Sequence, residues 1–218
     1  MTSGTLLAVC RVHELLPTKD STGVTAIDKR AVGGPVNVHP LGLTGDVQAS
    51  RKHHGGPTKA IYAYSQQDAE YWASELGREV TPGLFGENLR VEGIDASHAV
   101  IGERWNVGDE VVLEVTMPRT PCVNFARHLG EKSWVKRFAE ANRVGTYLSV
   151  VTKGSISAGD TISVSHVPEH GVTAAQVYAG PSAGQAHALL DAASAGLVVL
   201  TPQVRKSVLK ALQVPAAP

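Results

Sequence analysis

The chain has 218 residues, of which 43% are hydrophobic and 18% are charged, a composition that fits one large folded domain and excludes a disordered chain. Lysine plus arginine equals aspartate plus glutamate at 20 each, which excludes a general nucleic-acid-binding protein. No apolar run reaches the ~18 residues of a membrane-spanning helix, and no signal peptide is expected. Two cysteines do not form a disulfide framework, so we expect a reducing, cytoplasmic location and no membrane partner.

Short strands dominate the first three quarters of the chain. Apolar or alternating runs broken by glycine and proline predict strands at 5–11, 23–28, 43–48, 59–64, 88–92, 110–116, 147–152 and 161–166. Strands this short and this closely spaced favour a mainly β fold. We therefore predict a mostly antiparallel β-barrel, closed or nearly closed, with a few inserted helices.

Helical signals interrupt this pattern at three places. Ser65 and Asp68 resemble a capping box, and apolar residues at helical spacing then run to Gly77, which ends the helix. Two shorter helices are expected at 123–129 and 133–141.

The composition changes again after the last predicted strand. Thr173 and Ser182 are suited to cap two short helices, and Thr201 stands before a proline at the first position of a third. We therefore divide the chain into a barrel domain over 1–168 and a three-helix extension over 169–218. Three short helices are marginal alone, so we expect them to pack on the barrel or on a second subunit, as in a homodimer.

The segment Met-Pro-Arg-Thr-Pro-Cys, ending at Cys122, is the most informative one. Its two prolines fix the backbone where a strand ends, so the thiol sits on a stiff turn, three residues after Arg119. A nearby cation favours the thiolate, which attacks electrophiles or binds metal. The competing interpretation is a buried structural cysteine, and it applies more strongly to Cys10, which lies in an apolar run. A disulfide between the two requires a proximity that sequence does not establish.

A loop over 45–57 combines Asp46, His54, Gly55 and Gly56. Glycines let backbone N–H groups turn toward an anion, and imidazole can carry a proton, contact an anion or bind a metal. The competing interpretation is an ordinary glycine-rich turn with solvated histidines.

A second glycine-rich loop spans 83–89 and contains Asn88, whose amide offers a donor and an acceptor to the edge of a heterocycle. Its alternative is a turn that enters a strand. Lys29 and Arg30 follow one predicted strand, and Arg143 precedes another. These cations suit contacts with phosphate, although each is otherwise a solvated surface charge.

Taken in order, these segments resemble the MOSC domain, a family named for the C-terminal domain of molybdenum cofactor sulfurases. The matching segments are AIDKR at 26–30, GDVQA at 45–49, HGGP at 54–57, GLFGENL at 83–89, IGE at 101–103, PRTPC at 118–122 and GSISAGD at 154–160. The helical tail resembles the three-helix extension of one bacterial branch. Thr58 and Ser50 stand where that branch usually has aspartate, a difference that bears on substrate preference.

The resemblance implies a barrel that holds a molybdenum cofactor (molybdopterin), with the Cys122 thiolate on molybdenum. The expected cofactor-binding residues are Lys29, Arg30, His54, Gly55, Gly56, Asn88, Arg119 and Arg143, and the expected catalytic residues are Cys122, His54 and Asp46. Relatives reduce N-hydroxylated compounds, and the bacterial branch is linked to N-hydroxylated purine analogues. Binding of pyridoxal phosphate is a further property expected only at the level of the family.

We therefore expect an oxidoreductase that reduces the N–O bonds of small N-hydroxylated substrates. Its electrons would come from a separate redox protein, because the chain has no flavin, haem or iron–sulfur signature. His54 or Asp46 would move the proton. Two alternatives stay open: a carrier of the cofactor, or of sulfur as a persulfide on Cys122, and a metal-free hydrolase that uses a Cys122–histidine pair.

Overall fold

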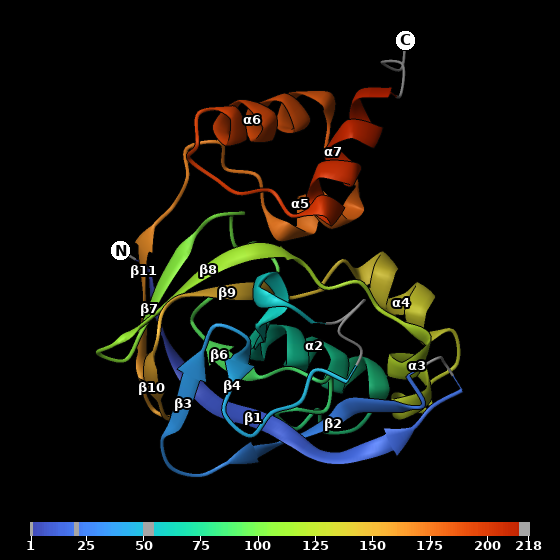
Figure 1. Ribbon diagram of the computed structural model, residues 1–218. Coiled ribbons are helices and arrows are strands. Elements are labelled where there is room, and N and C mark those ends of the chain that lie inside the picture. Colours follow the sequence, from blue (N-terminus) through green and yellow to red (C-terminus); the bar gives the residue numbers. More distant parts are fainter. Residues whose placement is uncertain (1, 20–21, 50–54, 214–218) are drawn as a thin grey trace.

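The computed structural model describes residues 2–19, 22–49 and 55–213 and shows a β-barrel with helices on its surface and three more helices at its C-terminal end (Figure 1). The strands are β1 (Ser3–Pro17), β2 (Val24–Val32), β3 (Val36–His39), β4 (Gly42–Leu43), β5 (Ile61–Ser65), β6 (Leu89–Glu92), β7 (Arg104–Val107), β8 (Val111–Pro118), β9 (Thr146–Thr152), β10 (Gly154–Ile156) and β11 (Thr161–His166). The helices are the 3-10 turn η1 (Pro57–Lys59), α2 (Gln66–Leu76), α3 (Val123–Leu129), α4 (Trp134–Ala141), α5 (Ala174–Ala179), α6 (Ala183–Ser194) and α7 (Pro202–Gln213).

Seven strands close the barrel in the order β11-β7-β8-β9-β5-β6-β1, and β1 then pairs with β11. β1 completes the ring because it is long enough to pair with β11 over 3–5, with β6 over 5–9 and with β2 over 9–17. The β5–β6 pair is parallel, and the other described pairs are antiparallel. Closure leaves no free sheet edge in the ring. The expected mostly antiparallel barrel is confirmed.

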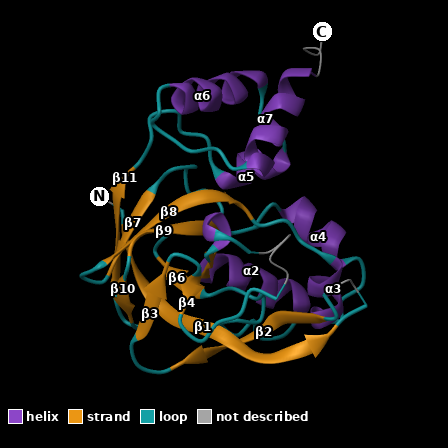
Figure 2. Ribbon diagram, viewed as in Figure 1, coloured by secondary structure: helices purple, strands orange, loops and turns teal. Residues whose placement is uncertain are grey.

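A small second sheet, β10-β3-β4, lies beside the barrel (Figure 2). Sequence patterns missed β3, β7 and β10, which are too short to establish an alternation of apolar and polar residues. The predicted strand over 43–48 is wrong, because β4 ends at Leu43 and the chain turns at Gly45, where φ is 83°. This turn directs Asp46 against β1, where its Oδ1 accepts a hydrogen bond from the Val12 N–H at 2.8 Å.

An aromatic cluster fixes α2, α3 and α4 against the barrel. Phe125 of α3 is fully buried and contacts the rings of Phe85 and Phe138, with centroid separations of 5.3 and 5.2 Å. Trp134 of α4 joins the cluster and reaches Trp72 of α2 at 4.6 Å. Burial of several large rings is a strong source of stability. The start of α3, directly after Cys122, is therefore held in place by its third residue.

The predicted capping box at the start of α2 is wrong. Ser65 does occupy the N-cap position, but its hydroxyl donates to the Ile94 carbonyl at 2.9 Å and accepts from the Ala96 N–H at 2.7 Å. The Asp68 carboxylate instead accepts from the Ser97 hydroxyl at 2.7 Å and pairs with Arg143. The helix ends as expected at Gly77, which takes the left-handed conformation with φ 61°.

The three predicted C-terminal helices are confirmed as α5, α6 and α7. Thr173 and Ser182 each form a capping box, and the Thr201 hydroxyl accepts from the Val204 N–H at 3.3 Å. The division of the chain at residue 168 and assembly into a homodimer stay predictions. Within the described ranges, no helix combines the length and the apolar character needed to cross a membrane.

Candidate active site

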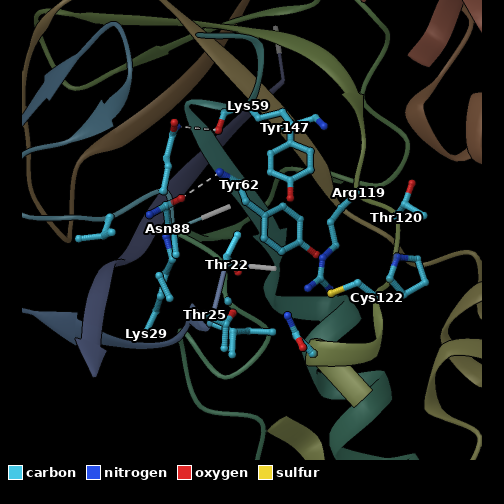
Figure 3. Close-up of a pocket in the computed structure, with 18 of the residues that line it drawn as sticks. Thr22, Thr25, Lys29, Lys59, Tyr62, Asn88, Arg119, Thr120, Cys122 and Tyr147 are labelled. Carbon is cyan, nitrogen blue, oxygen red and sulfur yellow. Dashed lines mark hydrogen bonds between the residues drawn. The ribbon is translucent and has the colours of Figure 1, made fainter. Parts of the chain in front are cut away.

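A cavity of about 700 Å³ brings together segments that are far apart in the chain. It lies between β2, the loop after β4, strands β5 and β9, and the turn at the end of β8 (Figure 3). Five of the residues singled out in the sequence line it: Lys29, Asp46, Asn88, Arg119 and Cys122. The volume is typical of a site for a small molecule or cofactor.

Cys122 stands at the junction of β8 and α3. It has extended backbone geometry as the N-cap residue of α3, and its side chain is partly exposed at the cavity wall (Figure 3). Cys10, in contrast, is fully buried, and burial raises the pKa of its thiol to about 12. Both cysteines are free, so the disulfide is not formed. The thiol on the proline turn is the accessible one, and the interpretation of Cys10 as a core residue is confirmed.

Arg119 is a buried cation with aromatic neighbours. The residue is 4% exposed, and its guanidinium carbon lies 3.8 Å from the Phe125 ring centroid and 5.2 Å from that of Tyr62. Its charge also opposes the rise in the pKa of the Tyr147 phenol that burial causes. In the described part of the chain, Nη1 has no hydrogen-bond partner and no carboxylate forms an ion pair with Arg119. A buried cation without a carboxylate partner is costly, so this wall beside Cys122 can accept an anionic group.

Lys29, Asp46 and Asn88 form one connected unit on the opposite wall. The Lys29 ammonium lies 2.5 Å from Asp46 Oδ2, and the Asn88 amide donates to the same oxygen at 2.8 Å. Asn88 also donates to the Cys10 carbonyl and accepts from the Tyr62 N–H. Both polar atoms of Asn88 are therefore engaged with the protein rather than with the edge of a heterocycle. Asp46 is held by Lys29, Asn88 and a backbone N–H, which makes it a brace for the ammonium group.

Two of the predicted cofactor-binding cations, Arg30 and Arg143, are not among the described residues that line the cavity. Neighbouring residues of a strand point to opposite faces, so Lys29 points inward and Arg30 outward, where it pairs with Asp28 at 3.2 Å. Arg143 pairs instead with the buried Asp68 carboxylate at 2.6 Å. The sequence predicted that Arg30 and Arg143 lie at strand ends, but it did not show which side of the barrel each side chain faces.

The first glycine loop is only partly described. His54 lies outside the described residues, so its predicted catalytic and cofactor-binding roles stay predictions. Gly55 and Gly56 are described and do not line the cavity. The Gly56 N–H donates to Gln48 Oε1 at 2.9 Å, and Gln48 does line the cavity. The described part of this loop therefore holds Gln48 rather than a ligand.

The second glycine loop packs on β2. A Cβ atom at Gly83, where φ is 90°, would lie 2.3 Å from the Lys29 carbonyl oxygen, so only glycine fits there. The buried Glu87 carboxylate closes the loop by accepting from the N–H groups of Gly83 and Phe85 and pairs with the buried Arg90. The loop supports Lys29 from behind, which favours the structural interpretation.

Sequence reasoning missed three large side chains of the cavity wall. Tyr62 and Tyr147 are register partners on β5 and β9, with ring centroids 5.4 Å apart, and burial raises the pKa of each phenol. Lys59 is the last residue of η1 and is 9% exposed, and burial lowers the pKa of its ammonium group. Alternation along β5 indicates that Tyr62 and Tyr64 share a face, but only barrel closure decides which face lines the cavity.

The family model of the MOSC domain matches residues 50–163, more than half of the chain. The chain belongs to the MOSC domain family. MOSC domains are associated with the molybdenum cofactor. The crystal structure of YiiM from Geobacillus stearothermophilus resembles this chain with a TM-score of 0.75 and 23% identity, over 96% of this chain and 99% of that one. This likeness shows that the fold, C-terminal helices included, recurs in the family.

Two relatives with higher sequence identity extend this comparison. The uncharacterized protein YflK of Bacillus subtilis is 33% identical over 149 residues, which are 68% of this chain and 67% of that protein. A protein of Gibberella moniliformis named Reductase is 33% identical over 147 residues, which are 66% of this chain. The matched region spans only 26% of that reductase, so the rest of it has no counterpart in this alignment.

Proposed function

We propose that this MOSC protein binds a molybdenum cofactor through Cys122 and reduces the N–O bonds of N-hydroxylated compounds with electrons from a separate redox protein. The observation that carries the proposal is a free, partly exposed thiol on a fixed turn, at the wall of a large cavity and beside a buried cation. The relative named Reductase supports redox chemistry for the family. A reducing, cytoplasmic location belongs to the same proposal and agrees with two free cysteines.

The described residues fit this cofactor. Thiolate is a soft ligand suited to a transition metal, and Cys122 presents it to the cavity. The unpartnered Arg119 Nη1 indicates a wall that lacks its anion, and the anionic sulfur and phosphate groups of a molybdopterin would complement it. In this proposal Cys122 holds the metal, and Arg119, Lys29 and Lys59 supply positive charge to the rest of the group.

The bound cofactor would supply the two electrons that convert a hydroxylamino group and two protons into an amine and water. The protein then has three tasks. Cys122 fixes the reacting centre at one wall, and Asp46 holds the Lys29 ammonium in place at the other. The buried rings of Tyr62 and Tyr147 exclude water from this part of the cavity. Burial also raises the pKa of both phenols, so they stay neutral. His54 or Asp46 would supply the proton for the departing oxygen; Asp46 already accepts from three donors, which favours His54 in this proposal.

The proposal is tested by loading the protein with molybdenum cofactor and supplying 6-hydroxylaminopurine with a chemical reductant. We expect formation of adenine by the loaded protein and loss of both bound molybdenum and turnover in Cys122→Ser. Cys10→Ala is the matched control and should retain the metal, because Cys10 is sealed in the core. A loaded, folded wild-type protein without turnover would refute the reductase proposal.

A carrier role is the second candidate, because partial exposure lets the Cys122 thiol reach a second protein as well as a substrate. Mass spectrometry distinguishes the two candidates. A stable adduct of one sulfur atom on Cys122, in protein without molybdenum, would favour the carrier. The hydrolase alternative gains no support, since no hydrogen bond joins Cys122 to a histidine in the described ranges.

A further inference from the structure

The C-terminal helices contribute to the wall of the active-site cavity. Gln203 of α7 lines the same cavity as Cys122 and the two residues before it, Thr120 and Pro121. Figure 1 shows α5 and α7 lying over β8, the strand that leads into the Cys122 turn. The extension is therefore part of the site and not only an appendage of the barrel.

The extension is fixed to the barrel by backbone hydrogen bonds. The Ala174 and Ala175 N–H groups at the start of α5 donate to barrel carbonyls at 2.9 and 2.8 Å, and Thr173 forms a β-bridge with Val100. These contacts set the position of α5 relative to the cavity.

α7 in turn packs on α5, and a capping residue stabilises its first turn. The Ser207 hydroxyl donates to the Val177 carbonyl at 3.1 Å, and Val204 and Val208 are buried on the inner face of α7. Thr201, at 2% exposure, caps the helix. Gln203 is therefore held in the first turn of a fixed helix, with its side chain on the exposed side.

The Gln203 amide has no hydrogen bond to another described residue, in contrast to two other amides of the cavity wall. Asn88 is engaged at both polar atoms, and Gln48 donates to two carbonyls while it accepts from the Gly56 N–H. A glutamine amide offers one donor next to one acceptor, which matches the purine edge where the N9–H lies beside the ring nitrogen N3, away from the hydroxylamino group.

We propose that Gln203 recognises the heterocyclic part of the substrate, so that the C-terminal extension acts as a specificity element of the MOSC active site. The thiol end of the cavity handles the N–O group, and Gln203 contacts the ring edge at the other end of the substrate. The inference rests on the proposed function for the class of substrate, but ring recognition is a binding property that needs no turnover.

The test compares the binding of two N-hydroxylated probes to cofactor-loaded protein without reductant, by isothermal titration calorimetry. 6-Hydroxylaminopurine has the donor–acceptor ring edge, and benzamidoxime has an aromatic ring without it. We expect Gln203→Ala to weaken the binding of 6-hydroxylaminopurine about 10-fold and to leave benzamidoxime within about twofold. Gln213→Ala, at the exposed far end of the same helix, is the matched control and should change neither.

Equal effects of Gln203→Ala on both probes, no effect on either, or no binding of 6-hydroxylaminopurine to the wild type would each overturn the inference. With reductant added, the same substitution should raise KM for 6-hydroxylaminopurine and leave kcat unchanged, because the contact is made equally in the ground state and the transition state. If the wild type binds the purine selectively through Gln203 but never turns it over, the reductase proposal fails and the specificity inference stands.

Discussion

The Asn88 side chain donates a hydrogen bond to the Asp46 carboxylate at 2.8 Å, which joins two loops that the sequence assigns to separate roles. Asp46 follows β4, and Asn88 precedes β6. Their contact places the Lys29 ammonium, which shares the same carboxylate oxygen. The position of the Lys29 ammonium on this cavity wall thus depends on Asn88, whose own amide is already engaged by the protein.

Substitution of Asn88 should therefore act mainly on stability. Asn88→Ala removes hydrogen bonds to Tyr62, Cys10 and Asp46 in a buried setting and should lower the free energy of unfolding by about 3 kcal/mol in urea denaturation. Asn106→Ala, where one exposed hydrogen bond to Ser165 is lost, should cost less than about 0.5 kcal/mol. Equal losses would contradict the bracing role.

Arg119 should show the opposite behaviour. Arg119→Met removes a buried charge without an ion-pair partner and preserves much of the contact with Phe125, so the free energy of unfolding should change by less than about 1 kcal/mol. Molybdenum retained after cofactor loading, measured by mass spectrometry of the metal, should fall at least about 10-fold. Arg127→Met, an exposed cation of the same cavity, is the control and should have the smaller effect. Full metal retention in Arg119→Met would show that this charge does not hold the cofactor.

Lys29 and Arg143 give a second contrast, between a cation at the cavity and one away from it. Lys29→Met leaves Asp46 without its ammonium partner and should lower both molybdenum retention and the free energy of unfolding, the latter by about 3 kcal/mol. Arg143→Met disrupts the pair with Asp68 but should leave molybdenum retention unchanged. Loss of the metal in Arg143→Met would place that residue at the cofactor after all.

The buried Cys10 thiol should lower the free energy of unfolding at alkaline pH. Its thiol has an ordinary pKa of 9.0 when unfolded and about 12 in the folded protein, so the folded state keeps a proton that the unfolded state releases above pH 9. Stability is therefore unaffected below pH 9 and falls as the pH rises toward 12. Between pH 8 and pH 10 the wild type should lose about 1 kcal/mol more than Cys10→Ala in urea denaturation. An identical pH dependence of the two proteins would refute the buried, protonated thiol.

Local patterns determined much of this protein from sequence alone. The strand over 161–166 and the helix over 123–129 lie where apolar spacing and the flanking turns predict them, and the caps at Thr173 and Ser182 form as expected. These features depend on residues within one or two turns of each other, so a linear pattern contains the necessary information. The stiff placement of Cys122 followed from two prolines for the same reason.

Only the tertiary structure decided which residues line the cavity. Alternation indicates that Lys29 and Arg30 face opposite sides of β2, but the closure of the barrel through β1 and β11 decides which of them is inside. The sequence likewise contains Arg143 and Gln203 without showing that Asp68 engages one of them while α7 carries the other to the cavity wall. Hydrogen bonds and packing between distant segments set these positions, and their energies appear in no local pattern.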